Sequence, residues 1–238
     1  MRVLIGEIVI GAYPPGENLP RETDLAQQFK VSRGVARECV RGLEERRLVV
    51  VKHGRGAAVT PPAEWDTFDP DVLEALLQGA QAAAVLSDYL ECRRILEVEA
   101  VGLAAERASD SELAALTAAF EEMEASARRA HANQAAEDLY HEADIAFHRA
   151  VVRASGNGAL GRMTEPIHRA LTPALRPLAR PEHRFERGLP EHQRILSAIR
   201  ARDAAGARAA MAEHLSTVER YLAEYQLAEG EREAAPAL

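Results

Sequence analysis

The chain has 238 residues, which is long enough for two hydrophobic cores, so we expect one small and one larger domain. Aromatic residues make up only 5% of the sequence, which favours closely packed helices over β-sandwiches. No stretch approaches the roughly 18 apolar residues of a membrane span, and the apolar run at the amino terminus is too short for a secretory signal. The composition therefore argues against a membrane protein and predicts a cytoplasmic one.

Charge is divided unevenly along the chain. Residues 1–60 hold ten Lys and Arg against seven Asp and Glu, although the formal net charge of the whole chain is −8. The segment 31–55 alone holds seven basic and three acidic residues. A basic region on an otherwise acidic protein fits a surface that contacts nucleic acid.

Three helices are predicted at the start of the chain. The first ends near Gly11, the second opens with Glu22, and the third begins near Ser32, a residue type that caps helices well. Apolar residues at helical spacing define the expected buried face of the third helix, namely Val35, Cys39, Val40 and Leu43. Arginines at four-residue intervals define its opposite face, namely Arg33, Arg37 and Arg41.

This arginine stripe has the geometry of a recognition helix whose first turns enter the major groove of DNA. We predict DNA contacts from Ser32 and the three arginines. A solvated helix face would look the same in isolation, so the prediction depends on the flanking elements. Directly afterwards, the apolar runs 48–51 and 57–59 predict a β-hairpin, with Gly54 and Gly56 permitting a tight turn around Arg55. Residues 1–60 therefore read as a winged helix-turn-helix.

A linker is predicted at residues 61–71, PPAEWDTFDPD, because the segment is rich in Pro and acidic residues. Its two aromatic residues, Trp65 and Phe68, are expected to pin the linker to a domain surface. Residues 72–230 then form the second domain, and residues 231–238 are expected to be a disordered tail.

The second domain has a helical pattern almost throughout. We expect helices near residues 71–79, 85–108, 111–132, 135–155, 158–178, 186–201 and 204–227. Ser109 and Glu112 fit a capping box, and Pro190 is expected near a helix start. The predicted fold is therefore mainly α, with a winged helix-turn-helix followed by an antiparallel bundle of six to seven helices.

Four residues of this bundle suit a transition-metal site. Asp144 and His148 are four residues apart on one helical face, and His192 and His214 fall on two later helices. Imidazole ligands suit Zn²⁺, Ni²⁺, Mn²⁺ or Fe²⁺ better than Ca²⁺ or Mg²⁺. If all four residues bind an octahedral ion, two positions stay open for a carboxylate that the protein would sense.

Spacing alone leaves other interpretations open, because a single His in a helix is more often a surface or hydrogen-bonded core residue. Four further histidines of this region have no assigned role, namely His131, His141, His168 and His183. His141 competes most directly for the metal, since it lies seven residues before His148 on nearly the same face.

Two resemblances cover nearly the whole chain. The segment PPGENLPRETDLAQQFKVSRGVARECVRGLEERRLV…GRGAAV resembles the signature of the GntR family of bacterial repressors. This resemblance implies that Arg33 and Arg37 contact DNA together with the wing residues His53, Arg55 and Gly56.

Residues 85–227 resemble the FCD ligand-binding domain of the FadR subfamily, through RRILEVEAVGLAAERA, DIAFHRAVVRASGN, EHQRILSAI and DAAGARAAMAEHL. The resemblance implies that Arg93 pairs with an anionic effector and that a divalent metal, Zn²⁺ in the first place, is held by Asp144, His148, His192 and His214. For Arg93 the alternative is a simple surface ion pair with Glu97.

These features predict a homodimeric transcription regulator, a repressor that a small carboxylate metabolite releases from double-stranded operator DNA. Dimerisation lets two recognition helices read the two half-sites of a palindrome. One alternative is a metal-dependent helical enzyme, a hydrolase or a non-heme iron enzyme, fused to a DNA-binding module. Another is a metal-free sensor of acyl ligands. The sequence has no HExxH motif, which argues against the enzyme, and the complete ligand set argues against the metal-free sensor.

Overall fold

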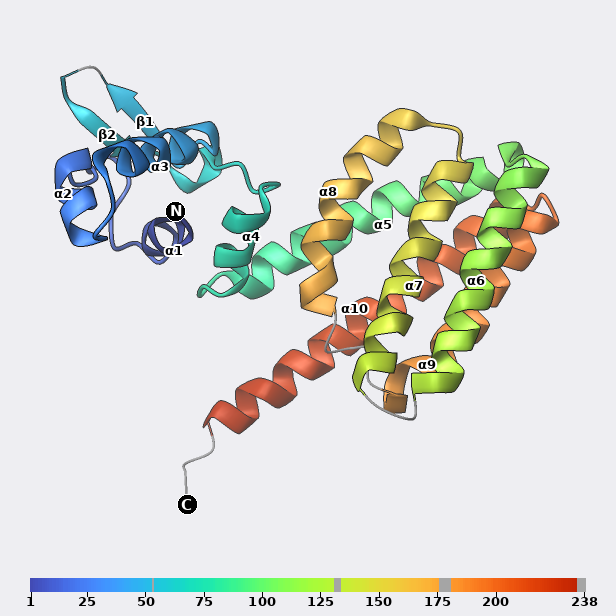
Figure 1. Cartoon of the computed structure of the whole chain (residues 1–238). Coiled ribbons are helices and arrows are strands. Elements are labelled where there is room, and N and C mark those ends of the chain that lie inside the picture. Colours follow the sequence, from blue (N-terminus) through green and yellow to red (C-terminus); the bar gives the residue numbers. More distant parts are fainter. Residues whose placement is uncertain (53, 131–133, 176–180, 235–238) are drawn as a thin grey trace. The chain divides into compact units, whose positions relative to one another are not determined.

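The computed structural model describes residues 1–52, 54–130, 134–175 and 181–234 (Figure 1). It divides into two compact units, Met1–Leu86 and Ser87–Leu238. The first unit extends beyond the linker suggested at residues 61–71, because helix α4 (Pro70–Leu77) packs against the first helix, α1 (Arg2–Val9). Val72 and Leu76 of α4 are part of the core of this unit. Among the described helices, none combines the length and the apolar character needed to cross a membrane.

The first unit contains the predicted helices and wing. After α1 come α2 (Glu22–Gln28), α3 (Arg33–Glu45) and a hairpin of β1 (Val49–Lys52) and β2 (Gly56–Val59), followed by the short 3₁₀ helix η1 (Pro62–Glu64). The strands pair antiparallel, with Val49 opposite Val59 and Lys52 opposite Gly56. The best-buried side chains of the core include Ile5 of α1, Leu25 of α2, Leu43 of α3 and Leu48, which directly precedes β1.

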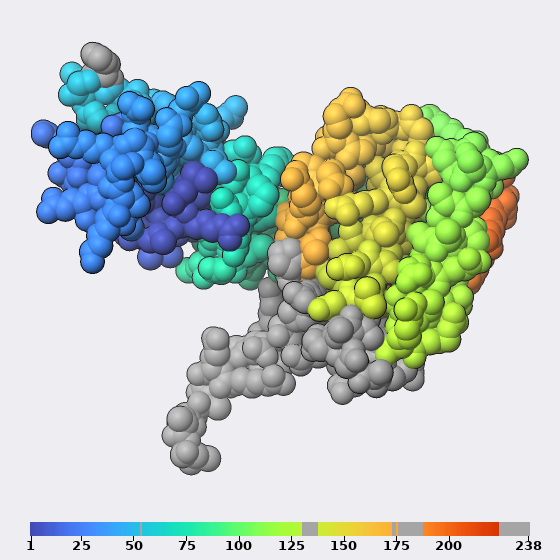
Figure 2. Space-filling view, in the orientation of Figure 1, coloured from blue at the N-terminus to red at the C-terminus, as the bar shows by residue number. Residues whose placement is uncertain are grey.

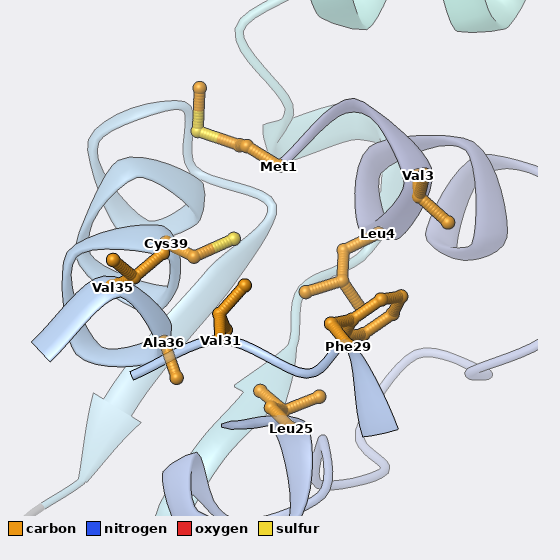
Figure 3. Close-up of a pocket in the computed structure, with 9 residues that line it drawn as sticks. All are labelled: Met1, Val3, Leu4, Leu25, Phe29, Val31, Val35, Ala36 and Cys39. Atoms are coloured by element: carbon orange, nitrogen blue, oxygen red, sulfur yellow. The ribbon is translucent and has the colours of Figure 1, made fainter. Parts of the chain in front are cut away.

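One position of the predicted buried face of α3 is wrong. Val35 is 55% exposed, and Ala36 is buried in its place. The buried stripe therefore starts one residue later and continues through Val40 and Leu43, which keeps the spacing of four and three residues. Val35 instead lies beside an apolar hollow of about 120 Å³ that α1, α2 and α3 enclose, and the side chains around it are labelled in Figure 3.

Helices and the short turns between them make up the described part of the second unit. Its helices are α5 (Ala82–Arg107, which begins before the unit boundary), α6 (Asp110–Ala130), α7 (Gln134–Ala154), α8 (Gly158–Leu175), α9 (Pro181–Arg200) and α10 (Ala204–Ala234). Helix α6 packs against α7 and α9, α7 packs against α8, and α9 packs against α10. Figure 2 shows α6, α7 and α8 side by side on one face of this unit. The predicted bundle of six to seven helices is confirmed.

Local signals in the sequence explain where several of these helices begin. Glu112 accepts a hydrogen bond from the backbone N–H of Ser109 at 2.8 Å, and the Ser109 hydroxyl accepts one from the N–H of Glu112 at 3.3 Å. This reciprocal pair is the predicted capping box of α6. Helix α7 ends before Gly156, whose φ of 68° suits glycine, and the side chain of Asn157 then caps α8.

Two predicted helix boundaries are wrong. Helix α9 begins at Pro181, and Pro190 lies inside it. A proline removes one backbone hydrogen bond, and here the helix continues past it. Helix α10 reaches Ala234, so residues 231–234 are helical although a disordered tail was expected there. Ala and Glu, which predominate in this stretch, favour helix. Residues 235–238 lie outside the described part.

Candidate metal centre and DNA-binding face

Helix packing brings the four predicted metal ligands together in the second unit. Asp144 and His148 come from α7, His192 from α9 and His214 from α10. One ligand atom from each lies within 4.8 Å of the others. All four residues are 1–2% exposed. Donor atoms this close have nearly the spacing expected around one ion with ligand distances of about 2.0–2.2 Å.

Each histidine of this cluster forms a hydrogen bond through its Nδ1 with a residue outside the cluster. His148 Nδ1–H donates to Glu97 at 2.6 Å, and His214 Nδ1–H donates to Glu191 at 2.9 Å. His192 Nδ1–H donates to the carbonyl of Gly188 at 2.7 Å. Carboxylates and carbonyls accept these bonds, so the protons sit on Nδ1 and the Nε2 atoms carry lone pairs. This outer arrangement is typical of metal-binding histidines.

The inner atoms of the cluster are acceptors that face one another. Nε2 of His192 lies 3.3 Å from Nε2 of His148 and 3.2 Å from Oδ1 of Asp144. Nε2 of His214 is buried and has no hydrogen-bond partner among the described residues. Lone pairs at such distances repel unless a cation lies between them, so the donor set fits a divalent metal.

Burial also favours the metal-binding form of the histidines. It lowers the pKa of His148 to about 4, although the nearby Glu97 works in the opposite direction. Burial, together with the neighbouring histidines, holds the pKa of His214 well below its usual range. Both rings are therefore neutral at neutral pH, the state in which imidazole binds a metal.

Glu97 of α5 lies next to this cluster without being part of it. It is fully buried and accepts hydrogen bonds from Arg93 Nε at 2.8 Å and from His168 Nε2 at 2.6 Å, in addition to the bond from His148. Burial opposes its ionisation, but the charge of Arg93 and the bonds from the two histidines outweigh burial and hold the pKa of Glu97 well below its usual range. Glu97 is therefore a buried carboxylate with three donors.

A small cavity adjoins the cluster. Its lining includes Arg93, Asp144 and His168 on the polar side and Ile145 and Leu171 on the apolar side. Arg93 is 5% exposed, so its ion pair with Glu97 is buried and the alternative of a surface pair is wrong. Asp144 lines the cavity and also belongs to the four-residue cluster, which makes the two sites neighbours.

His141, the competing metal ligand, does not join the cluster. Its Nε2 lies 2.8 Å from the carbonyl of Thr172, and its ring lines the cavity instead. His168 also lies outside the cluster and contacts Glu97. His131 and the side chain of His183 fall outside the described residues.

The recognition helix of the first unit carries its basic residues on the surface. The Ser32 hydroxyl caps α3 by accepting from the N–H of Val35 at 3.3 Å. Arg33, Arg37 and Arg41 are all exposed. Arg37 lies 3.9 Å from Glu38, and Arg41 lies 3.3 Å from Glu45, so both guanidinium groups have an acidic neighbour on the same helix. Exposed pairs of this kind are weak and leave the arginines available to phosphates or bases.

The wing has the predicted glycine-flanked tip. Gly54 and Gly56 have φ values of 72° and 88°, and Arg55 between them is exposed. Glycine adopts such angles at the lowest cost, which favours a tight turn here. His53 lies outside the described residues, so its predicted DNA contact has no structural counterpart here.

Comparison with known proteins matches both units. Residues 3–59 match the bacterial regulatory proteins of the gntR family, and residues 88–217 match the FCD domain. The chain belongs to the GntR family. The galactonate operon transcriptional repressor of Escherichia coli K12 is 34% identical over 220 residues, which span 92% of this chain and 93% of that protein. The transcriptional regulator LutR of Bacillus subtilis is 31% identical over 90% of this chain and 95% of its own.

Solved structures show the same fold at lower identity. Lar, which controls the expression of the agr system of Listeria monocytogenes, has a TM-score of 0.58 and 18% identity over 93% of this chain and 94% of its own. A GntR protein of Streptococcus agalactiae has a TM-score of 0.51 and 24% identity over 92% of this chain and all of its own. The relatives of this GntR protein are transcription regulators and not enzymes, which disfavours the fused-enzyme alternative.

Sequence reasoning missed the hydrogen-bonding residues next to the metal cluster in this GntR protein. It assigned no role to Glu191 or His168 and treated Glu97 only as a surface partner of Arg93. The spacing of Arg93 and Glu97, four residues apart in one helix, was a usable signal for their pairing. Nothing in the local sequence indicates that the same carboxylate also meets histidines from α7 and α8.

Proposed function

We propose that this GntR regulator is a repressor whose affinity for operator DNA is controlled by a small carboxylate metabolite at a metal site in its FCD domain. The observation that carries the proposal is the set of inward-facing acceptors on Asp144, His148, His192 and His214, each histidine held by an outer partner. Four such atoms that face one another in a protein core would be stabilised by a shared cation.

The donor set favours a divalent transition metal, with Zn²⁺ first and Ni²⁺, Mn²⁺ or Fe²⁺ as alternatives. When bound, this ion supplies positive charge and an open coordination position for a carboxylate oxygen. Arg93 supplies the second cationic group, since it lines the cavity that also reaches Asp144. A site that offers both the metal ion and Arg93 to one carboxylate would be highly selective for anions.

The winged helix supplies the operator contacts, through Ser32, the arginine stripe of α3 and the wing residues His53, Arg55 and Gly56. The E. coli relative is named as a repressor, which supports the same direction of control here. We infer that the protein acts as a homodimer, because two recognition helices are needed to read a palindromic site. Release of DNA requires only that the effector favour the DNA-free state, and a coupling of about 1–3 kcal/mol is typical.

The test uses the full-length protein and the DNA upstream of its own gene. Operator binding is followed by fluorescence anisotropy with a panel of carboxylates, first with Zn²⁺ loaded and then after the metal has been removed by a chelator. We expect at least one small carboxylate to release DNA only from the metal-loaded protein. A response that survives complete metal removal would favour the metal-free acyl sensor. Turnover of the carboxylate would favour the alternative of a metal-dependent enzyme.

A further inference from the structure

Gly34 lies in the first turn of α3, and no contact among the described residues requires a glycine there. A Cβ atom added at Gly34 would have Oγ of Ser32 as its nearest neighbour, at 3.8 Å, which is an ordinary van der Waals contact. Gly42, further along the same helix, is different, because a Cβ there would come within 2.7 Å of Sδ of Met1. Packing within the chain therefore explains Gly42 but not Gly34.

A glycine at this position carries a cost for the fold. Glycine loses more backbone freedom than alanine when a helix forms, so it is the less stable choice in a helix. Gly34 has the helical backbone that any residue can adopt, and it is exposed. What the missing side chain provides is a helix surface that a partner can approach closely.

The place of Gly34 in the helix identifies that partner as DNA. Gly34 follows Arg33 directly and precedes Arg37 by three residues, and both arginines are exposed. Residues 3–59 match the gntR family of regulators, and α3 is the recognition helix of this unit. The first turn of a recognition helix is the part that reaches base edges in the major groove.

The chemistry of this turn indicates which base it meets. Gly34 offers no side-chain donor or acceptor, and the adjacent Val35 is apolar and 55% exposed. The apolar group that base pairs present in the major groove is the C5-methyl of thymine. An amino or carbonyl group of another base would lose its hydrogen bonds with water against such a surface.

We propose that Gly34 determines specificity, and that its missing side chain makes room for the methyl group of one thymine in each half-site of the operator. Val35 forms an apolar wall beside this methyl group. The inference rests on the proposed function, because it presupposes that α3 enters the major groove. It does not depend on the metal or on the effector.

The experiment removes single methyl groups from the DNA. The operator upstream of the protein's own gene is mapped by footprinting, and each of its thymines is replaced in turn by uracil, which lacks only the C5-methyl. Binding of the full-length protein is measured by fluorescence anisotropy. Loss of the contacted methyl should weaken binding by the wild type about fourfold, which corresponds to about 0.8 kcal/mol for one buried methyl-sized group.

Gly34→Ala adds a methyl group to the protein at the proposed contact. The variant should unfold at the same or a higher temperature than the wild type, because alanine favours helix. It should bind the natural operator about tenfold more weakly or worse, since an extra methyl group overfills a close-packed contact. Uracil at the contacted position should restore much of this affinity, so the variant should prefer uracil where the wild type prefers thymine.

Gly6→Ala is the matched control. Gly6 lies inside α1 of the same unit, and a Cβ atom there would meet nothing within 4 Å. This variant should gain the same helical stabilisation as Gly34→Ala and should bind both the natural and the uracil operators as the wild type does. A change in stability alone therefore cannot imitate the expected result.

The other outcomes overturn the inference in distinguishable ways. If Gly34→Ala binds the natural operator as tightly as the wild type, DNA does not approach this position. If its binding is weaker but no uracil restores it, the contact is with the sugar and phosphate backbone and not with a thymine. Arg37→Ala tests the proposed function separately. If this variant also binds normally, the recognition helix is wrongly assigned and the proposed DNA contacts fail as well.

Discussion

The carboxylate of Glu97 lies 2.6 Å from Nδ1 of His148, and this contact determines which nitrogen of His148 faces the metal cluster. Glu97 lies on α5 and His148 on α7. Glu97 is not itself a candidate ligand, but it orients His148, a candidate ligand on another helix. The same carboxylate binds Arg93 and His168. The cluster, the cavity and the proposed effector partner are therefore joined through one buried group.

Glu97→Gln should weaken Zn²⁺ binding by about tenfold or more, because the outer partner of a metal-binding histidine sets its orientation and basicity. The amide keeps the shape of the carboxylate but cannot accept from Arg93 and both histidines at once. Competition with a chromogenic chelator measures the change. Glu165→Gln is the control, since Glu165 pairs with Arg149 at the surface of α8, and equal losses in both variants would contradict the outer-partner role.

His192→Ala and His214→Ala should each lose the bound metal while retaining the helical circular dichroism of the wild type. The wild type, purified without chelator, should carry about one divalent transition ion per chain, measured by elemental analysis. His141→Ala is the comparison variant, because His141 is equally buried but bonds to the Thr172 carbonyl. Full metal content in both ligand variants would place the metal elsewhere.

Arg37→Ala should weaken operator binding by about 1–3 kcal/mol if Arg37 reads a base edge, and should relax specificity at that base. Arg55→Ala should lower affinity for all sequences and reduce the salt dependence if Arg55 contacts a phosphate. Arg194→Ala, at a surface ion pair of α9 with Glu213, should change neither property. Anisotropy titrations at two salt concentrations would show whether the recognition helix and wing are assigned correctly.

Trp65→Ala should destabilise the first unit by about 3–5 kcal/mol, because a large buried side chain would leave a cavity. Trp65 is 9% exposed, packs in the first core and donates from its indole to the Thr60 carbonyl at 3.1 Å. Phe68→Ala should cost no more than about 0.5 kcal/mol, since Phe68 is 51% exposed. Chemical unfolding of the two variants would test whether only Trp65 anchors the segment, as its burial indicates.

The helices could be predicted because their signals are local or periodic, such as the capping box at Ser109. For the four-residue cluster, spacing placed only Asp144 and His148 on one helical face, and the resemblance to the FCD domain implied that His192 and His214 join them. The hydrogen-bonding residues next to the cluster could not be found this way. Glu97 and Glu99 stand two residues apart and look alike in the sequence, yet Glu97 is fully buried while Glu99 pairs with Arg208 at the surface. Only the packing of other helices against α5 distinguishes them.

Arg93→Ala should abolish the response to the effector while leaving operator affinity nearly unchanged, which gives a permanent repressor. The reason is that Arg93 lines the cavity beside Asp144, whereas the proposed operator contacts are on α3 and the wing. Arg94→Ala is the matched control, because the adjacent Arg94 is exposed and lies 3.6 Å from Glu219. Metal content should stay close to one ion, since His148 keeps its bond to Glu97 in the absence of Arg93. Anisotropy with increasing carboxylate would measure release of DNA. If the Arg93 variant still releases the operator at the wild-type effector concentration, Arg93 is not the partner of the effector anion.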